Sequence, residues 1–149
     1  MYTLDTNAIL YYLKDDSAAV SVLRSVFAEN VAVYVSAVTE LELFAYSDLT
    51  AKEEALIEEL LKTISVIPIE SRIARLAALV RRHYRLKVPD SVIGATAMFT
   101  GSRLLTRNTR FPKDSRSYGP QNITNSVISR SQSYFPLPTN PSVLLTANL

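Results

Sequence analysis

The chain has no cysteine and a single histidine, His83, among its 149 residues. The lack of cysteine excludes disulfide bonds, thiol catalysis and iron–sulfur clusters. One histidine cannot complete a structural zinc site, which needs four nitrogen or sulfur ligands, so His83 is predicted to be a surface or packing residue. Any bound metal ion must therefore be held by oxygen atoms, which favour hard ions such as Mg²⁺ or Mn²⁺.

Signals for export and for membrane insertion are also missing. No basic segment precedes an apolar run at the N-terminus, and Asp5 lies inside that region, so the start does not resemble a signal peptide. The longest uncharged stretch, residues 131–149, is interrupted by three prolines and cannot span a membrane. With 48% apolar and 20% charged residues, the composition is that of an ordinary soluble domain, which we expect in the cytoplasm.

Short apolar runs alternate with stretches of helical periodicity along the chain. Strands are predicted at residues 2–4, 31–35, 65–69 and 103–105. Helix starts are predicted at Asp5, at Asp16 or Ser17, at Ser36 or Thr39, and at the capping box formed by Thr50 and Glu53. The helix after that capping box should bury one apolar face, made of Leu56, Ile57, Leu60, Leu61 and Ile64. Residues 91–100 are almost wholly apolar and follow Pro89, which predicts a buried helix with proline in its first turn.

Strands that alternate with helices pair in parallel through right-handed crossovers. We therefore predict a three-layer α/β/α fold with a central, mostly parallel sheet of four to five strands, formed by residues 1–111. Residues 112–149 differ in composition, because they hold five of the seven prolines, seven serines and only four charged residues. This second segment is predicted to be irregular.

Three carboxylates fall close to predicted strand ends. Asp5 follows the first strand, Glu42 lies in the helix after the second, and Asp90 opens the buried helix. Each has an ordinary explanation, as a helix cap, a solvated acid and a first-turn helix acid respectively. In a parallel sheet, however, they can meet at one edge, where like charges repel unless a divalent cation neutralises them. The pattern predicts metal-assisted hydrolysis at a Mg²⁺ or Mn²⁺ site.

Four segments in the correct order carry a resemblance to a known family. LDTN, VSAVTELEL, VPDSVIGATAM and TGSRLLTRN resemble the motifs of PIN-domain nucleases, and among these the VapC-like toxins of type II toxin–antitoxin pairs. The resemblance implies Asp5, Glu42 and Asp90 as catalytic, metal-binding residues and Asn108 as a fourth metal ligand. It implies supporting roles for Thr6, Asn7 and Thr106. It also implies an RNA substrate, a homodimer and inhibition by a cognate antitoxin.

The sequence departs from the family pattern after the last predicted strand. Many relatives have aspartate where this chain has Asn108, and they usually have an acid where it has Arg110. Asn108 could equally be a turn residue. Asp114 is the only acid beyond this point, so the sequence leaves open whether Asn108 or Asp114 completes the site and whether the site binds one ion or two.

Charge is distributed unevenly although the net charge is only +2. Residues 40–62 carry seven acids and two bases, whereas residues 70–87 carry six bases and one acid. Arginine binds RNA phosphates with little sequence preference, and the candidates nearest the motifs are Arg82, Arg85, Arg107 and Arg110. A solvated helix face is the ordinary alternative for such a run.

The leading hypothesis from the sequence is a metal-dependent endoribonuclease that acts as the toxin of a toxin–antitoxin pair. A phosphatase of the haloacid-dehalogenase type also begins with an aspartate after the first strand, but it needs a second aspartate two residues later, where this chain has Asn7. A degenerate, non-catalytic PIN domain that binds RNA or a protein is the other alternative, because Asn108 is neutral.

Overall fold

The computed structural model describes residues 1–108 and residue 111. Within this part of the chain, four strands form one sheet in the order β3-β2-β1-β4, and every pairing is parallel. The strands are β1 (Tyr2–Leu4), β2 (Val33–Ser36), β3 (Ser65–Ile67) and β4 (Arg103–Leu105). The predicted parallel sheet is confirmed, while the prediction for residues 112–149 lies outside the described residues.

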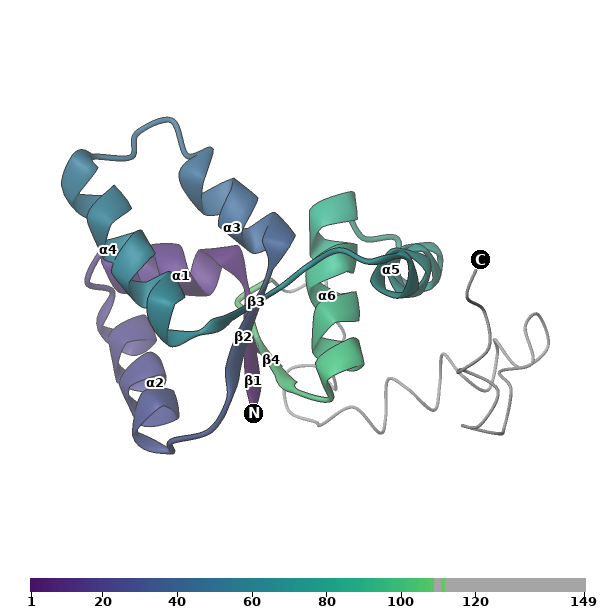
Figure 1. Ribbon diagram of the computed structural model, residues 1–149, viewed down its shortest axis with the longest axis horizontal. Helices are drawn as coiled ribbons and strands as arrows, with labels where there is room; N and C mark the ends of the chain where they lie inside the picture. Colours follow the sequence, from purple (N-terminus) through teal and green to yellow (C-terminus); the bar gives the residue numbers. More distant parts are fainter. Residues whose placement is uncertain (109–110, 112–149) are drawn as a thin grey trace, which may run out of the picture.

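Six helices surround this sheet in the described part of the chain. They are α1 (Thr6–Leu13), α2 (Ser17–Ala28), α3 (Ala37–Phe44), α4 (Ala51–Thr63), α5 (Ser71–Tyr84) and α6 (Val88–Thr100). Figure 1 shows α1, α2 and α4 on one side of the sheet and α6 with α5 on the other, with α3 above the end of β2. The three-layer α/β/α prediction is therefore confirmed. No helix among residues 1–108 is both long and apolar enough to cross a membrane.

Local capping explains why several helices begin where they do. The Asp16 carboxylate accepts a hydrogen bond from the Ala19 backbone N–H, and Ser36 accepts one from Val38, so Ser36 and not Thr39 caps α3. Thr50 and Glu53 form the reciprocal capping box that the sequence predicted. These caps satisfy backbone N–H groups that have no partner inside the helix.

Two predicted strand boundaries were wrong by two residues. The second strand begins at Val33 and not at residue 31, because Val31 and Ala32 lie exposed before the point where Val33 pairs with Tyr2. The third ends at Ile67, just before Pro68, whose missing N–H cannot join a ladder.

The buried helix α6 forms the centre of the second layer. Residues 91–97 are all buried, and α6 packs on β1, β2 and β4 while α5 covers its outer side. A Cβ atom on Gly94 would lie only 3.0 Å from Cε1 of Phe111, whose side chain is also buried. The glycine thus allows Phe111 to pack on α6 one turn after Asp90, which ties the segment after β4 to the start of this helix.

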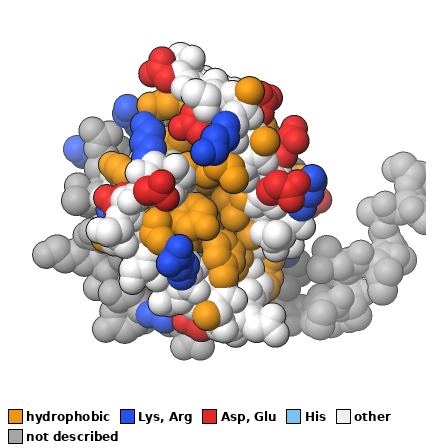
Figure 2. Space-filling view, turned by 90° about the vertical axis from the view of Figure 1, so that its left-hand side faces the viewer, with side chains coloured by type: hydrophobic (Ala, Val, Ile, Leu, Met, Phe, Trp, Pro, Cys, Tyr) orange, Lys and Arg blue, Asp and Glu red, His pale blue; other side chains and the backbone are white. Residues whose placement is uncertain are grey.

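The opposite layer leaves apolar side chains exposed. Figure 2 shows this face, where orange side chains gather near the centre within a rim of mixed charge. Exposed apolar side chains on α1, α2 and α4 include Tyr11, Val22, Phe27 and Leu56. Leu56 was predicted to be part of the buried face of α4, but its side chain is 46% exposed, whereas Ile57 beside it is fully buried.

Candidate active site

The predicted site residues lie at the carboxyl edge of the sheet. Asp5 directly follows β1, Glu42 is on α3, which follows β2, and Thr106 and Asn108 follow β4. Asp90 lies in the first turn of α6, which packs against β1, β2 and β4. Ligands of parallel α/β sheets bind at this edge, so the topology places these residues where a ligand site is expected.

Asp5 is the most buried of the three acids, with 2% of its surface exposed. It occupies the N-cap position of α1, but its side chain makes no capping hydrogen bond to that helix. Instead, Thr106 Oγ1 donates a hydrogen bond of 2.5 Å to Asp5 Oδ2 across the β1–β4 pair. Helix capping therefore does not account for this buried carboxylate.

The other two acids are held by hydrogen bonds from neighbouring site residues. Thr6 Oγ1 donates to Glu42 Oε2 at 2.5 Å, and Asn108 Nδ2 donates to Asp90 Oδ1 at 3.0 Å. The Asn108 backbone N–H also donates to Thr106 Oγ1 at 2.9 Å. Hydrogen bonds thus connect Asp5 with Asp90 through Thr106 and Asn108, while Glu42 is bound by Thr6, the residue that follows Asp5 in the chain.

Burial is the main cause that raises the pKa of Asp5 above its ordinary value. The hydrogen bond from Thr106 opposes this shift, while the negative charges of Asp90 and Glu42 add to it. The charges of Asp90 and Glu42 therefore both act on the Asp5 carboxylate.

The donor chemistry of this network fits a hard divalent cation. Its groups are three carboxylates and one amide, which are oxygen donors of the kind that Mg²⁺ and Mn²⁺ bind. Among residues 1–108 and 111, however, no three acidic or histidine side chains lie together as a ready-made metal site. In this arrangement the carboxylates of Glu42, Asp5 and Asp90 accept hydrogen bonds from Thr6, Thr106 and Asn108 respectively.

Asn108 acts here as a donor. Its amide nitrogen donates to Asp90 Oδ1, and a side-chain amide binds cations only through its oxygen atom. An aspartate at this position would place a further negative charge beside Asp90. The asparagine therefore lowers the charge of the site while it fixes the orientation of Asp90.

Thr39 adds a buried polar group one helical turn before Glu42. Its hydroxyl is fully buried and is the only buried side-chain polar atom among the described residues without a hydrogen-bond partner. Residues three apart share a helix face, so Thr39 lies on the same side of α3 as Glu42. Leaving such a group without a partner costs about 1–3 kcal/mol.

Some of the residues singled out in the sequence lie outside the hydrogen-bond network. Asn7 is exposed, and within the described part of the chain it joins none of these hydrogen bonds. Arg82 and Arg85 are exposed at the end of α5, where Arg85 has φ 53° in the left-handed region. His83 is an exposed residue that packs edge-on against Tyr84, as predicted. Arg110 and Asp114 lie outside the described residues.

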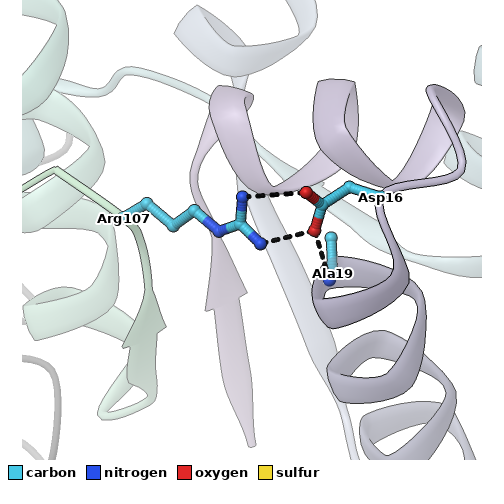
Figure 3. Close-up of polar contacts among 3 residues, drawn as sticks. All are labelled: Asp16, Ala19 and Arg107. Carbon is cyan, nitrogen blue, oxygen red and sulfur yellow. Dashed lines mark hydrogen bonds and ion pairs between the residues drawn. The ribbon is translucent and has the colours of Figure 1, made fainter.

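Arg107 makes an ion pair that the sequence did not predict. Its guanidinium binds the carboxylate of Asp16, which caps α2, as Figure 3 shows. It also lies over the ring of Tyr11, 4.5 Å from the centroid. The two charged residues are 91 positions apart in the chain, and no local sequence pattern signals a contact at that separation.

The raised pKa of Asp5 predicts a specific pH dependence of stability. The folded protein binds a proton at Asp5 more strongly than the unfolded chain does, so ionisation of Asp5 lowers the free energy of unfolding as pH rises above the ordinary value of 3.8. In EDTA, Asp5→Asn should therefore unfold at higher urea concentration than the wild type at pH 7, and this advantage should shrink towards pH 3.

The matched control for this measurement is Asp48→Asn, which replaces an exposed acid between α3 and α4. This substitution should change the free energy of unfolding by no more than about 0.5 kcal/mol at either pH value. An Asp5→Asn protein that is less stable than the wild type at pH 7 would contradict the account of Asp5 as a costly buried charge.

Comparison with known proteins agrees with this geometry. Residues 2–115 match the family model described as the PIN domain. A toxin–antitoxin complex from Klebsiella pneumoniae has 28% identity and a TM-score of 0.63, over 73% of this chain and 88% of that one. FitAcB from Neisseria gonorrhoeae has 27% identity and a TM-score of 0.59, over 78% and 91% of the two chains.

DNA-bound VapBC from Salmonella typhimurium shares the fold, with 21% identity and a TM-score of 0.63 over 74% of this chain and 89% of that chain. No curated protein is similar enough in sequence to be matched. The resemblance to VapC-like toxins that the four motifs carried is thus confirmed. The order of the strands, the position of the three acids and the match over residues 2–115 lead to the same conclusion: the chain belongs to the PIN domain family.

Proposed function

We propose that this protein is a metal-dependent endoribonuclease that acts as the toxin of a toxin–antitoxin pair. The observation that carries the proposal is the set of hydrogen bonds from Thr106, Thr6 and Asn108 that hold Asp5, Glu42 and Asp90 at the carboxyl edge of the sheet. Three acids held at this edge, one of them buried and destabilised by its own charge, are more consistent with a cation site than with structural roles. Family membership and the similar toxin–antitoxin structures support the same function.

In this proposal each residue of the network has a defined task. Asp5, Glu42 and Asp90 hold the cation, with the side-chain oxygen of Asn108 as a fourth ligand. Thr6 and Thr106 orient Glu42 and Asp5. A Mg²⁺ or Mn²⁺ ion, when bound, supplies Lewis acidity that activates water and offsets negative charge on the scissile phosphate.

The partner that fits the toxin proposal is a cognate antitoxin. One of the similar structures is a toxin–antitoxin complex from Klebsiella pneumoniae. This chain leaves apolar side chains exposed over α1, α2 and α4, which is typical of a surface that binds another protein (Figure 2). We propose that an antitoxin segment covers this face, that the toxin forms a homodimer, and that it acts on RNA in the cytoplasm.

Cleavage of RNA by the purified protein tests the proposed activity. With Mg²⁺ or Mn²⁺ present we expect cleavage of a single-stranded RNA, and EDTA should abolish it. Asp5→Asn, Glu42→Gln and Asp90→Asn should each reduce the rate by at least about 100-fold, because each removes a ligand charge from the site. The matched control is Glu40→Gln on the same helix, which should retain the wild-type rate within about twofold.

Two outcomes would count against the proposal. Cleavage that survives Asp5→Asn would exclude the carboxylate site as its source. A wild-type protein that binds RNA without cleaving it at any divalent cation concentration would favour the degenerate, non-catalytic PIN domain.

Arg82 and Arg85 are proposed to bind the RNA backbone beside the site. Both are exposed, neither makes an ion pair with another described residue, and Arg85 lies five positions before Asp90. Arg85 adopts a left-handed conformation that costs a residue with a side chain about 1 kcal/mol, and glycine is the usual occupant of such a helix end. Backbone stability alone would therefore favour glycine over arginine at this position.

Replacing Arg85 with glycine separates stability from RNA binding. Arg85→Gly should raise the free energy of unfolding by about 1 kcal/mol. It should also weaken RNA binding, and the slope of the logarithm of the RNA association constant against the logarithm of the salt concentration should become shallower by about 1. Binding is measured in the Asp5→Asn background to prevent cleavage. Arg24→Gln, an exposed arginine on α2, is the control and should leave the slope unchanged. An unchanged slope in Arg85→Gly would remove this residue from the RNA surface.

A further inference from the structure

Arg107 lies in the chain between the two residues that hold the site carboxylates. Thr106 donates to Asp5, and Asn108 donates to Asp90. The Asn108 backbone N–H donates back to Thr106 Oγ1, which is a turn-type contact across Arg107. The side chain of Arg107 extends to the connection between α1 and α2.

The contact at that connection is specific and has several parts. Arg107 Nη2 lies 2.5 Å from Asp16 Oδ1, and Nη1 lies 3.3 Å from Asp16 Oδ2. Asp16 Oδ1 also accepts the Ala19 N–H at 2.9 Å, which fixes the carboxylate at the start of α2 (Figure 3). The guanidinium carbon also lies 4.5 Å from the centroid of the Tyr11 ring, which is a cation–π contact. A two-pronged pair with a cation–π contact defines orientation as well as position.

This pairing conflicts with the use of Arg107 as a phosphate ligand. The donors on Nη1 and Nη2 face Asp16, and the nearby carboxylate cancels the positive charge that would attract RNA. The side chains of the pair are 44% and 35% exposed, and exposed ion pairs contribute little to the stability of a whole fold. The effect of the pair is therefore local, on the segment that carries Thr106 and Asn108.

We propose that Arg107 is a positioning residue for the active site. By binding Asp16 and Tyr11 it anchors residues 106–108 to the opposite helical layer, so that Thr106 stays on Asp5 and Asn108 stays on Asp90. The expected effect on RNA cleavage rests on the proposed nuclease function. The expected effect on the order of residues 106–108 does not depend on that function.

A double-mutant cycle on RNA cleavage tests the catalytic consequence. The variants are Arg107→Gln, Asp16→Asn and the double variant, and asparagine is chosen at position 16 because it also caps helices well. Each single change should lower kcat about tenfold with KM unchanged, because Thr106 and Asn108 would no longer be held on the carboxylates Asp5 and Asp90. The double variant should be no slower than either single variant, because both remove the same contact. Arg107→Lys should recover part of the rate.

A phosphate-binding role for Arg107 predicts the opposite results. Asp16→Asn would then free the guanidinium and lower KM, whereas Arg107→Gln would raise KM and reduce the salt dependence of binding. Either pattern, or effects that add in the double variant, would overturn the proposal.

Amide hydrogen exchange tests the structural consequence without any measurement of activity. The Asn108 backbone N–H, which donates to Thr106 Oγ1, should exchange about tenfold faster in Arg107→Gln and in Asp16→Asn than in the wild type. Amides of β2 should be unaffected, and Arg24→Gln on α2 should leave Asn108 protected. Equal exchange at Asn108 in all these proteins would overturn the proposal. If the wild type cleaves no RNA, the proposed function fails while this measurement still decides the role of Arg107.

Discussion

The burial of one carboxylate, Asp5, is the constraint on which the rest of the site depends. Its chain position directly after β1 places it between β2 and β4, so the parallel sheet itself removes it from water. A buried charge is costly unless it is hydrogen-bonded or neutralised. Thr106 supplies a hydrogen bond, but the charges of Glu42 and Asp90 increase the cost again. A cation at this place would relieve the burial and the repulsion together, which is why we regard the unfavourable carboxylate as functional.

The neutral Asn108 is consistent with the interpretation of Asp5 as part of a cation site. It donates to Asp90, and so it stabilises an acid that a fourth carboxylate would repel. The backbone N–H of the same residue binds Thr106, which in turn binds Asp5, so one short segment after β4 controls two of the three acids. The same segment makes two further contacts, because Arg107 pairs with Asp16 and Phe111 packs beside Gly94.

Much of the fold and of the candidate site could be predicted from the sequence because the determining signals are local. Thr50 and Glu53 form a capping box within four residues. The almost wholly apolar composition of residues 91–97 predicts burial without any knowledge of the elements that pack on them. The prediction that Asp5, Glu42 and Asp90 belong to one edge of the sheet rested on the rule that parallel strands end at the same edge. The pair between Arg107 and Asp16 could not be predicted, since it depends on the tertiary packing of distant segments. The exposure of Leu56 was missed because helical periodicity identifies an apolar face without showing what covers it.

Calorimetric titration with Mn²⁺ shows whether Asp5, Glu42 and Asp90 hold a cation, and it requires no substrate. We expect saturable binding to the wild-type protein that is weakened at least about tenfold in Asp5→Asn and in Asp90→Asn, and that is unchanged in Glu40→Gln. Binding of equal strength in the wild type and Asp5→Asn, or no binding to the wild type, would contradict the proposed cation site.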